Sequence, residues 1–95
     1  MLFRISKTMN LVIRMVKEFE EVFFAIDEIL EDVTVPRNVK KKLAETKELL
    51  QKEDVAVSIR INQALNKLEE LSEETNINPF TRTQIWNVVS MLESI

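Results

Sequence analysis

The chain has 95 residues, of which 13 are basic and 16 acidic, and its net charge is −3 at pH 7. This length fits one small domain with a single core, and the net charge argues against nucleic acid as the main partner. The chain contains no Cys, His or Gly. It therefore lacks disulfides, thiolate or imidazole metal ligands, a histidine general base and a glycine-rich phosphate-binding loop.

A long amphipathic pattern fills the first third of the chain. Its period is typical of a helix that packs along its length against other helices, and it predicts a helix from Leu2 to Asp32, with Ser6 or Thr8 as the cap if the helix begins later. The apolar residues recur at alternating spacings of three and four: Leu2, Ile5, Met9, Val12, Val16, Phe19, Phe23, Ile26, Leu30 and Val33, with Met15, Val22 and Ile29 widening the stripe on one side.

Three shorter helices are predicted to follow. Pro36 suits the first turn of the second helix, Asp54 is the predicted N-cap of the third, and Asn78 followed by Pro79 opens the fourth. The three predicted apolar stripes are Val39, Leu43, Thr46 and Leu50; then Val57, Ile61, Ala64, Leu68 and Leu71; then Arg82, Ile85, Val89 and Leu92, flanked by Trp86 and Val88.

The two halves of the chain resemble each other. Each half has a helix, a short turn with Thr and a β-branched residue, a proline (Pro36 or Pro79) and a second helix. A period of roughly forty residues gives this pattern a distant HEAT-like repeat character, but two units are too few for a solenoid. We therefore predict an all-α, roughly up-and-down four-helix bundle built from two similar hairpins.

The turn Val35-Pro36-Arg37-Asn38 and the segment from Arg82 to Glu93 resemble the small archaeal proteins catalogued as uncharacterised protein family 0147. The resemblance covers roughly residues 20–93. It implies an all-helical fold, an archaeal origin and no assigned activity or catalytic residue. We expect residues 1–14 to be a helical extension outside the family pattern, and residues 15–95 to form the single four-helix domain.

The predicted helix lengths suggest a homodimer. A helix from Leu2 to Asp32 spans about 45 Å, whereas the second and fourth helices span about 24 Å each. The first helix must then extend beyond its own bundle and leave an apolar surface that monomers avoid. We predict that a second copy covers this surface, with Leu2, Ile5, Met9, Val12 and Phe24 in the contact; the alternatives are disorder of the segment or a break near Asn10.

Two clusters of charged residues, one basic and one acidic, are candidate binding sites. Arg37, Lys40, Lys41 and Lys42 begin the second helix, where they can contact phosphate, so an accessory nucleic-acid-binding protein is the alternative function. The acids Glu28, Glu31 and Asp32 share a helix face, but no Asp/Asn/Gly loop surrounds them to wrap a cation. We interpret these acids as a solvated surface and predict no metal, no cofactor and no enzymatic activity.

Trp86, the single Trp, either fills the core beside Ile85 and Val89 or anchors a partner, and we favour the core. Arg82 and Asn87 either hold an inter-helix turn by bonding backbone carbonyls or face a ligand. Residues 1–17 carry basic residues and no acid, yet no signal peptide or membrane span is predicted; weak attachment to anionic lipid is a third role. We predict a cytoplasmic protein-interaction or scaffolding module.

Overall fold

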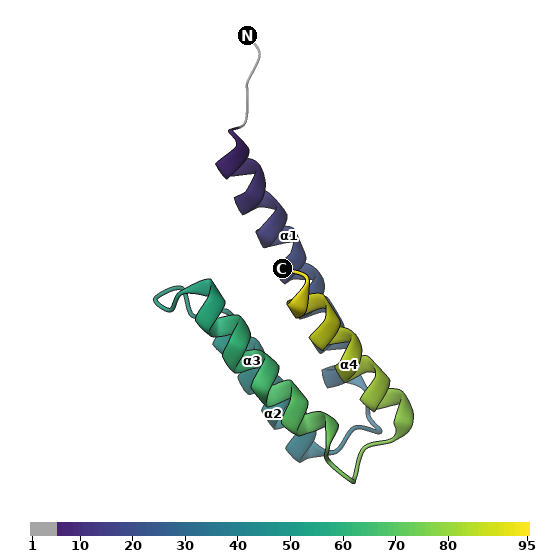
Figure 1. The fold of residues 1–95 in the computed structure, drawn as a ribbon. Coiled ribbons are helices and arrows are strands. Elements are labelled where there is room, and N and C mark those ends of the chain that lie inside the picture. The colour runs from purple at the N-terminus through teal and green to yellow at the C-terminus, as the bar shows by residue number, and fades with distance from the viewer. Residues whose placement is uncertain (1–5) are drawn as a thin grey trace.

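The structure is a computed structural model that describes residues 6–95, and in that range it contains four helices and no strands. The helices are α1 (Lys7–Glu31), α2 (Arg37–Leu50), α3 (Val57–Ser72) and α4 (Pro79–Glu93). Each helix packs against its neighbours in the chain, and α1 also packs against α4 (Figure 1). The predicted up-and-down four-helix bundle is confirmed.

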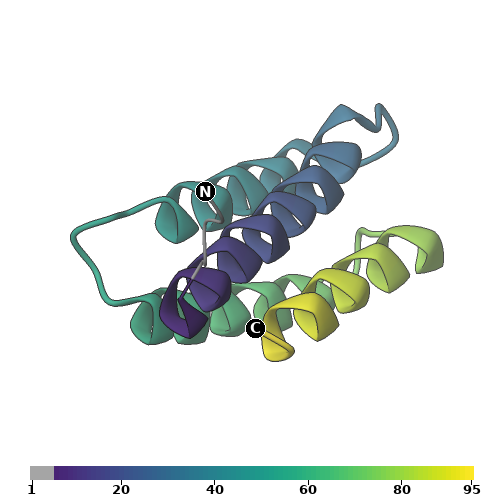
Figure 2. The same cartoon turned by 90° about the horizontal axis from the view of Figure 1, so that it is seen from above.

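The two hairpins, α1–α2 and α3–α4, lie side by side when the bundle is seen from above (Figure 2). Of the four pairs of helices in contact, two are within hairpins and two join the hairpins, so no helix crosses the bundle diagonal. The core lies between the hairpins and draws on all four helices. Its members are Val22, Ile26, Ile29, Val35, Val39, Leu43, Leu50, Ala64, Leu68, Leu71, Ile77, Ile85, Val88, Val89 and Leu92.

The predicted stripes of α2, α3 and α4 supply much of this core. In α1 the buried face is rotated about the helix axis relative to the predicted stripe. Val22, Ile26 and Ile29 are fully buried, although we expected Val22 and Ile29 only to flank the stripe. Phe23 is partly buried, and Val33 is 91% exposed. The prediction for Val33 is wrong because α1 ends at Glu31 and the turn directs this side chain to solvent.

The helix starts follow from local chemistry. The Ser6 hydroxyl accepts a hydrogen bond from the backbone N–H of Met9 at 3.1 Å, which confirms it as the N-cap of α1. Asn78 caps α4 by accepting from the N–H of Thr81 at 2.7 Å, and Pro79 is the first helical residue as predicted. The predicted end of α1 is also confirmed, since Asp32 is its C-cap.

Two predicted starts are wrong. Pro36 is the N-cap of α2, and its carbonyl accepts from the N–H of Lys40 at 3.0 Å, so it precedes the helix by one residue. Ala56, not Asp54, is the N-cap of α3, and it offers no side-chain acceptor. The α2–α3 turn is two residues longer than a cap at Asp54 allows, and within it the backbone N–H of Val55 donates to the carbonyl of Lys52 at 3.3 Å.

Candidate functional site

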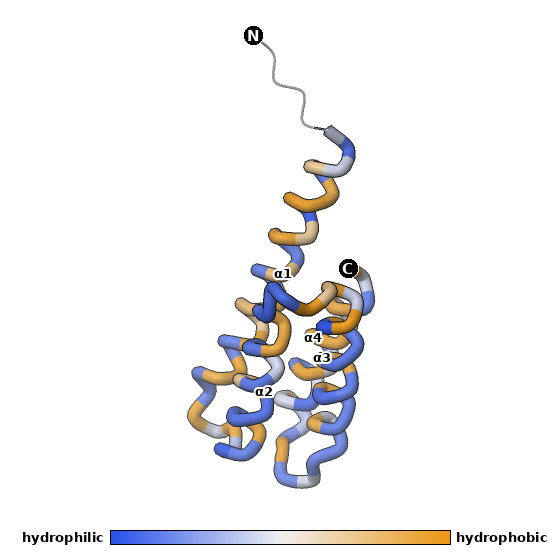
Figure 3. Tube along the Cα trace, turned by 90° about the vertical axis from the view of Figure 1, so that its left-hand side faces the viewer, coloured by the Kyte–Doolittle hydropathy of each residue, from blue (hydrophilic) through white to orange (hydrophobic). Residues whose placement is uncertain are grey.

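The N-terminal half of α1 projects beyond the other three helices (Figure 1). With 25 residues α1 is about 37 Å long, while α2 to α4 have 14 to 16 residues and span about 21–24 Å. We call residues 7–16 the overhang. Its apolar residues appear as orange bands on the projecting part of the trace in Figure 3. Five of them are 42–59% exposed: Met9, Leu11, Val12, Ile13 and Val16.

The overhang contains part of the predicted dimer contact. Met9 and Val12 are more than half exposed, and Phe24, farther along α1, is 67% exposed. Leu2 and Ile5, the other two residues of that prediction, lie outside the described residues. The unbroken helix from Lys7 onward means that the alternative of a break near Asn10 is wrong.

An apolar groove begins where the overhang meets the bundle. It runs between α1 and the α2–α3 turn, and we call it the apolar groove. Within it the rings of Phe19 and Phe23 are tilted at 37° with centroids 6.1 Å apart. The groove is lined by Val12, Met15, Val16, Phe19, Glu20, Phe23, Leu50, Gln51, Glu53, Val57 and Arg60.

A cation lies near Phe23, the last residue of α1 that lines the apolar groove. Lys47 of α2 lies 5.9 Å from the ring centroid of Phe23 and donates to the carboxylate of Asp27 at 2.8 Å. Neither Lys47 nor Asp27 lines the groove. The α1 lining of the groove therefore extends from Val12 in the overhang to Phe23, and the ion pair lies next to Phe23.

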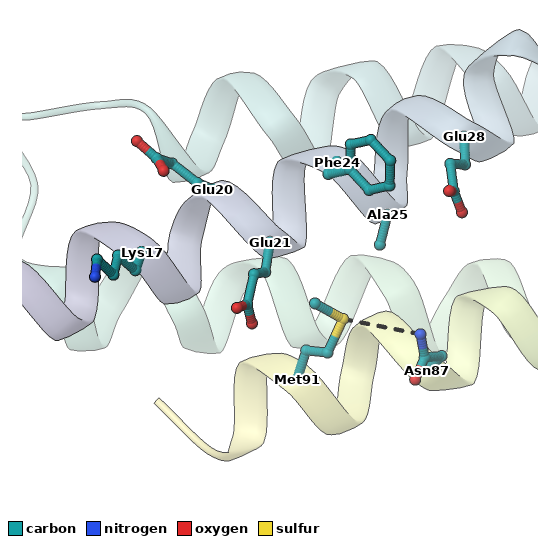
Figure 4. A pocket seen from close by; sticks show the side chains of 8 residues that line it. All are labelled: Lys17, Glu20, Glu21, Phe24, Ala25, Glu28, Asn87 and Met91. Carbon is teal, nitrogen blue, oxygen red and sulfur yellow. Dashed lines mark hydrogen bonds between the residues drawn. The ribbon is translucent and has the colours of Figure 1, made fainter.

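A second groove, the acidic groove, lies between α1 and the outer side of α4 (Figure 4). Glu21 and Ala25 point toward α4 in that view, and Asn87 donates to the sulfur of Met91 at 3.8 Å. Asn87 therefore faces a groove and holds no turn in the described structure. The groove is lined by Lys17, Glu20, Glu21, Phe24, Ala25, Glu28, Asn87 and Met91.

The preferred core role of Trp86 is wrong, because its side chain is 48% exposed. Successive helical residues are 100° apart, and α4 directs Ile85, Val88 and Val89 into the core, so Trp86 falls at the edge of the buried face. The turn-holding role of Arg82 is confirmed. Its Nε donates to the carbonyl of Ser72 and an Nη donates to the carbonyl of Glu74, both at 2.9 Å.

In the basic cluster at the start of α2, two residues lie near an acidic side chain and two are exposed to solvent. Lys42 donates to the carboxylate of Glu74 at 3.0 Å, and the charge of Lys40 acts on Asp32. Arg37 and Lys41 are exposed. The four residues therefore do not form one face of free cations, and nucleic-acid binding stays a prediction.

Asp32, one of the three acids predicted to share a face at the end of α1, has a hydrogen-bonding partner in the following turn. Thr34 donates to Asp32 from its hydroxyl at 2.7 Å and from its backbone N–H at 2.9 Å, and these bonds, with the charge of Lys40, lower the pKa of Asp32. Among residues 6–95, no three acidic side chains come close enough together to hold a metal ion. In the same range no helix has the length and apolarity needed to cross a membrane.

Sequence reasoning predicted the overhang but missed both grooves. The overhang follows from helix lengths, which a sequence reports through its periodicity. The grooves depend on where the α2–α3 turn and the end of α4 lie along α1, and this is set by packing. Large apolar residues on a helix surface, such as Phe24 and Trp86, mark a candidate site. They can be recognised as exposed only once it is known which face of each helix is turned to the core.

Comparison with known proteins agrees with the resemblance. The model of the uncharacterised protein family UPF0147 matches residues 6–95. A UPF0147 protein of Archaeoglobus fulgidus is 43% identical over 79 residues, which cover 83% of this chain and 90% of the relative. A relative from Pyrococcus furiosus is 32% identical and covers 96% of this chain and 88% of its own. Because the family match begins at residue 6, our expectation that residues 1–14 lie outside the family pattern is wrong for residues 6–14.

Solved structures share the fold. The crystal structure of a UPF0147 protein from Thermoplasma acidophilum aligns with a TM-score of 0.78 at 32% identity, over 82% of this chain and 92% of that one. A crystal structure of a protein of unknown function aligns with a TM-score of 0.78 at 32% identity, over 99% of this chain and 98% of that one. The second alignment necessarily includes most of the overhang. By the family match and these relatives, the chain belongs to the uncharacterised protein family UPF0147.

Proposed function

We propose that this protein is an interaction or scaffolding module of the archaeal cytoplasm, without chemistry of its own. Its binding surface consists of the overhang and the apolar groove. The observation that supports this proposal is the exposure of five large apolar side chains within ten consecutive residues of a well-formed helix. Contiguous apolar surface of this kind marks a contact site in soluble proteins.

The lining of the apolar groove suits the side chains of a helix. Phe19, Phe23, Leu50 and Val57 come from three helices and offer apolar surface on both sides of the groove. The lining also includes two exposed acids, Glu20 and Glu53. An amphipathic helix bound in such a groove buries its apolar residues at helical spacing and leaves its polar face in water.

Site-specific photocrosslinking tests this proposal. A benzophenone amino acid replaces Val12 in the overhang, and in a matched control it replaces Gln63, an exposed residue of α3 away from both grooves. In extract of an archaeal host, the probe at residue 12 should give discrete protein adducts that the probe at residue 63 does not.

Competition separates binding from general stickiness. Excess wild-type chain should suppress the adducts, whereas a Val12→Glu/Val16→Glu chain should not, because two carboxylates in this apolar surface would be buried without partners. Both side chains are about half exposed, so the double variant should keep the fold. Equal labelling at residues 12 and 63 would contradict the proposal.

A further inference from the structure

Resting on the proposed function, we infer that the partner of the overhang is a second copy of this chain. The two α1 helices run antiparallel, and each overhang lies in the apolar groove of the other copy. Three features of α1 lead to this arrangement: the repetition of one apolar stripe, the length of the groove and the division of charge along the helix.

The stripe is complementary to itself. Met9, Val12 and Val16 of the overhang continue, at spacings of three and four, into Phe19 and Phe23 of the groove. Such spacing forms the seam of paired helices. A two-fold axis close to Val16 brings Met9 of each copy opposite Phe23 of the other. The same patch on both copies then forms the contact, as a two-fold interface requires.

The dimensions of the overhang and the groove agree. The overhang spans about 15 Å, and the α1 wall of the groove, from Val12 to Phe23, spans about 17 Å. Beyond Phe23 the pair of Lys47 and Asp27 occupies this side of α1. An overhang therefore fills the groove of the second copy and ends where the ion pair begins.

Charge selects the antiparallel orientation. Lys7, Arg14 and Lys17 carry the charge of residues 6–17, which include no acid. In the described structure none of the three is in an ion pair. The following part of α1 carries six acids over residues 18–31. Antiparallel helices place the basic half of each copy beside the acidic half of the other, whereas parallel helices place like charges together.

Light scattering of the purified full chain tests the partner. We expect twice the monomer mass at micromolar concentration, and the monomer mass for the Val12→Glu/Val16→Glu variant. Circular dichroism of the variant should show unchanged helix content, since neither residue belongs to the core. Its melting temperature should no longer rise with protein concentration, because the monomer lacks the stabilisation that dimer formation gives the wild type. A wild-type monomer, or a dimer that survives both substitutions, would overturn the inference.

Cysteine crosslinking tests the orientation, because the chain has no cysteine of its own. Val16→Cys lies near the proposed axis and should be joined to its twin by a short bismaleimide. Met9→Cys is a matched control of similar exposure, and in the antiparallel pair its twin is about 21 Å away. Linking at both positions would show parallel helices. A wild-type dimer that links at neither position would show that a different surface forms the dimer contact. Either result would overturn the proposed arrangement.

The two proposals fail in different ways. If the chain is monomeric but the probe at residue 12 labels another protein, the interaction function holds and the second copy is excluded as the partner. If the chain is monomeric and the probe labels nothing above the control at residue 63, both proposals fail.

Discussion

Arg82 donates from Nε to the carbonyl oxygen of Ser72 at 2.9 Å, and Arg60 donates from an Nη to the carbonyl of Leu50 at the same distance. Each arginine is the fourth residue of its helix and reaches the last residue of the preceding helix. Helix ends leave carbonyl groups without partners, and glycine often helps to satisfy them in a left-handed cap. This chain has no glycine, and the C-caps after α2 and α3 are right-handed. The arginines supply donors to these carbonyls instead.

This arrangement predicts a loss of stability when Arg82 is changed. Arg82→Ala should lower the free energy of unfolding by about 1.5–3 kcal/mol, because two hydrogen bonds from a charged donor are lost at a half-buried turn. Arg82→Lys should recover only part of this, since an ammonium group cannot reach both carbonyls as the planar guanidinium does. Urea unfolding measures both values. Arg37→Ala, at an exposed arginine, is the control and should change stability by less than about 0.5 kcal/mol.

Trp86 and Ile85 form a matched pair on α4, one half-exposed and one fully buried. Ile85→Ala should cost about 2–5 kcal/mol, because it leaves a cavity in the core. Trp86→Ala should cost less, about 1.5 kcal/mol or below, since half of the ring already contacts water. Thermal melts of the two variants give the comparison. A larger loss at Trp86 than at Ile85 would mean that the ring is buried in solution.

The helices and their order could be predicted from the sequence because both depend on local signals. The three-four spacing of apolar residues and the caps at Ser6 and Asn78 are readable without tertiary structure. The cap of α3 could not be predicted in this way. Asp54 has a good capping side chain, but it lies in a turn in which the N–H of Val55 bonds the carbonyl of Lys52, and the N-cap is Ala56. A local preference for capping therefore does not decide the helix start.

The candidate site could be predicted only in part. The overhang follows from the unequal helix lengths, and Phe24, a member of the predicted dimer contact, is exposed on α1. The sequence shows where a stripe lies but not which edge of it faces the core. In α1 the buried centre is Val22, Ile26 and Ile29, so Phe19 and Phe23 move to the edge and line a groove. That rotation is a property of the assembled bundle.

The lowered pKa of Asp32 predicts a pH-dependent contribution to stability. The side-chain bond from Thr34 is its largest cause, so Thr34→Ala should raise the pKa of Asp32 toward its ordinary value of 3.8. The folded-state pKa lies below the unfolded one, so the carboxylate stabilises the fold above the ordinary Asp range and loses this effect as the pH falls through the folded value. Carboxyl NMR titration of the wild type and the variant checks this. Equal Asp32 values in the two proteins would contradict the assigned cause.

The basic cluster gives a prediction about nucleic acid. Lys42 is paired with Glu74 and Lys40 lies in the field of Asp32, so we expect no retention of mixed RNA at about 0.15 M salt. A gel shift at low and physiological salt measures this. A shift at physiological salt that disappears in Arg37→Glu/Lys41→Glu, at the two exposed members, would favour the nucleic-acid role instead.

The capping residues of α3 and α4 predict opposite effects of reciprocal substitutions. Asn78 accepts from the N–H of Thr81, whereas Ala56 begins α3 with a similar extended ψ and no side-chain acceptor. Asn78→Ala should therefore cost about 1 kcal/mol, and Ala56→Asn should stabilise the protein by up to about 1 kcal/mol. Ala56 is exposed, so the added amide is not forced into the core. Urea unfolding of both variants provides the measurement, with Ala56→Val as a control that adds volume without an acceptor. If Ala56→Asn stabilises no more than Ala56→Val, a missing cap is not what limits the start of α3.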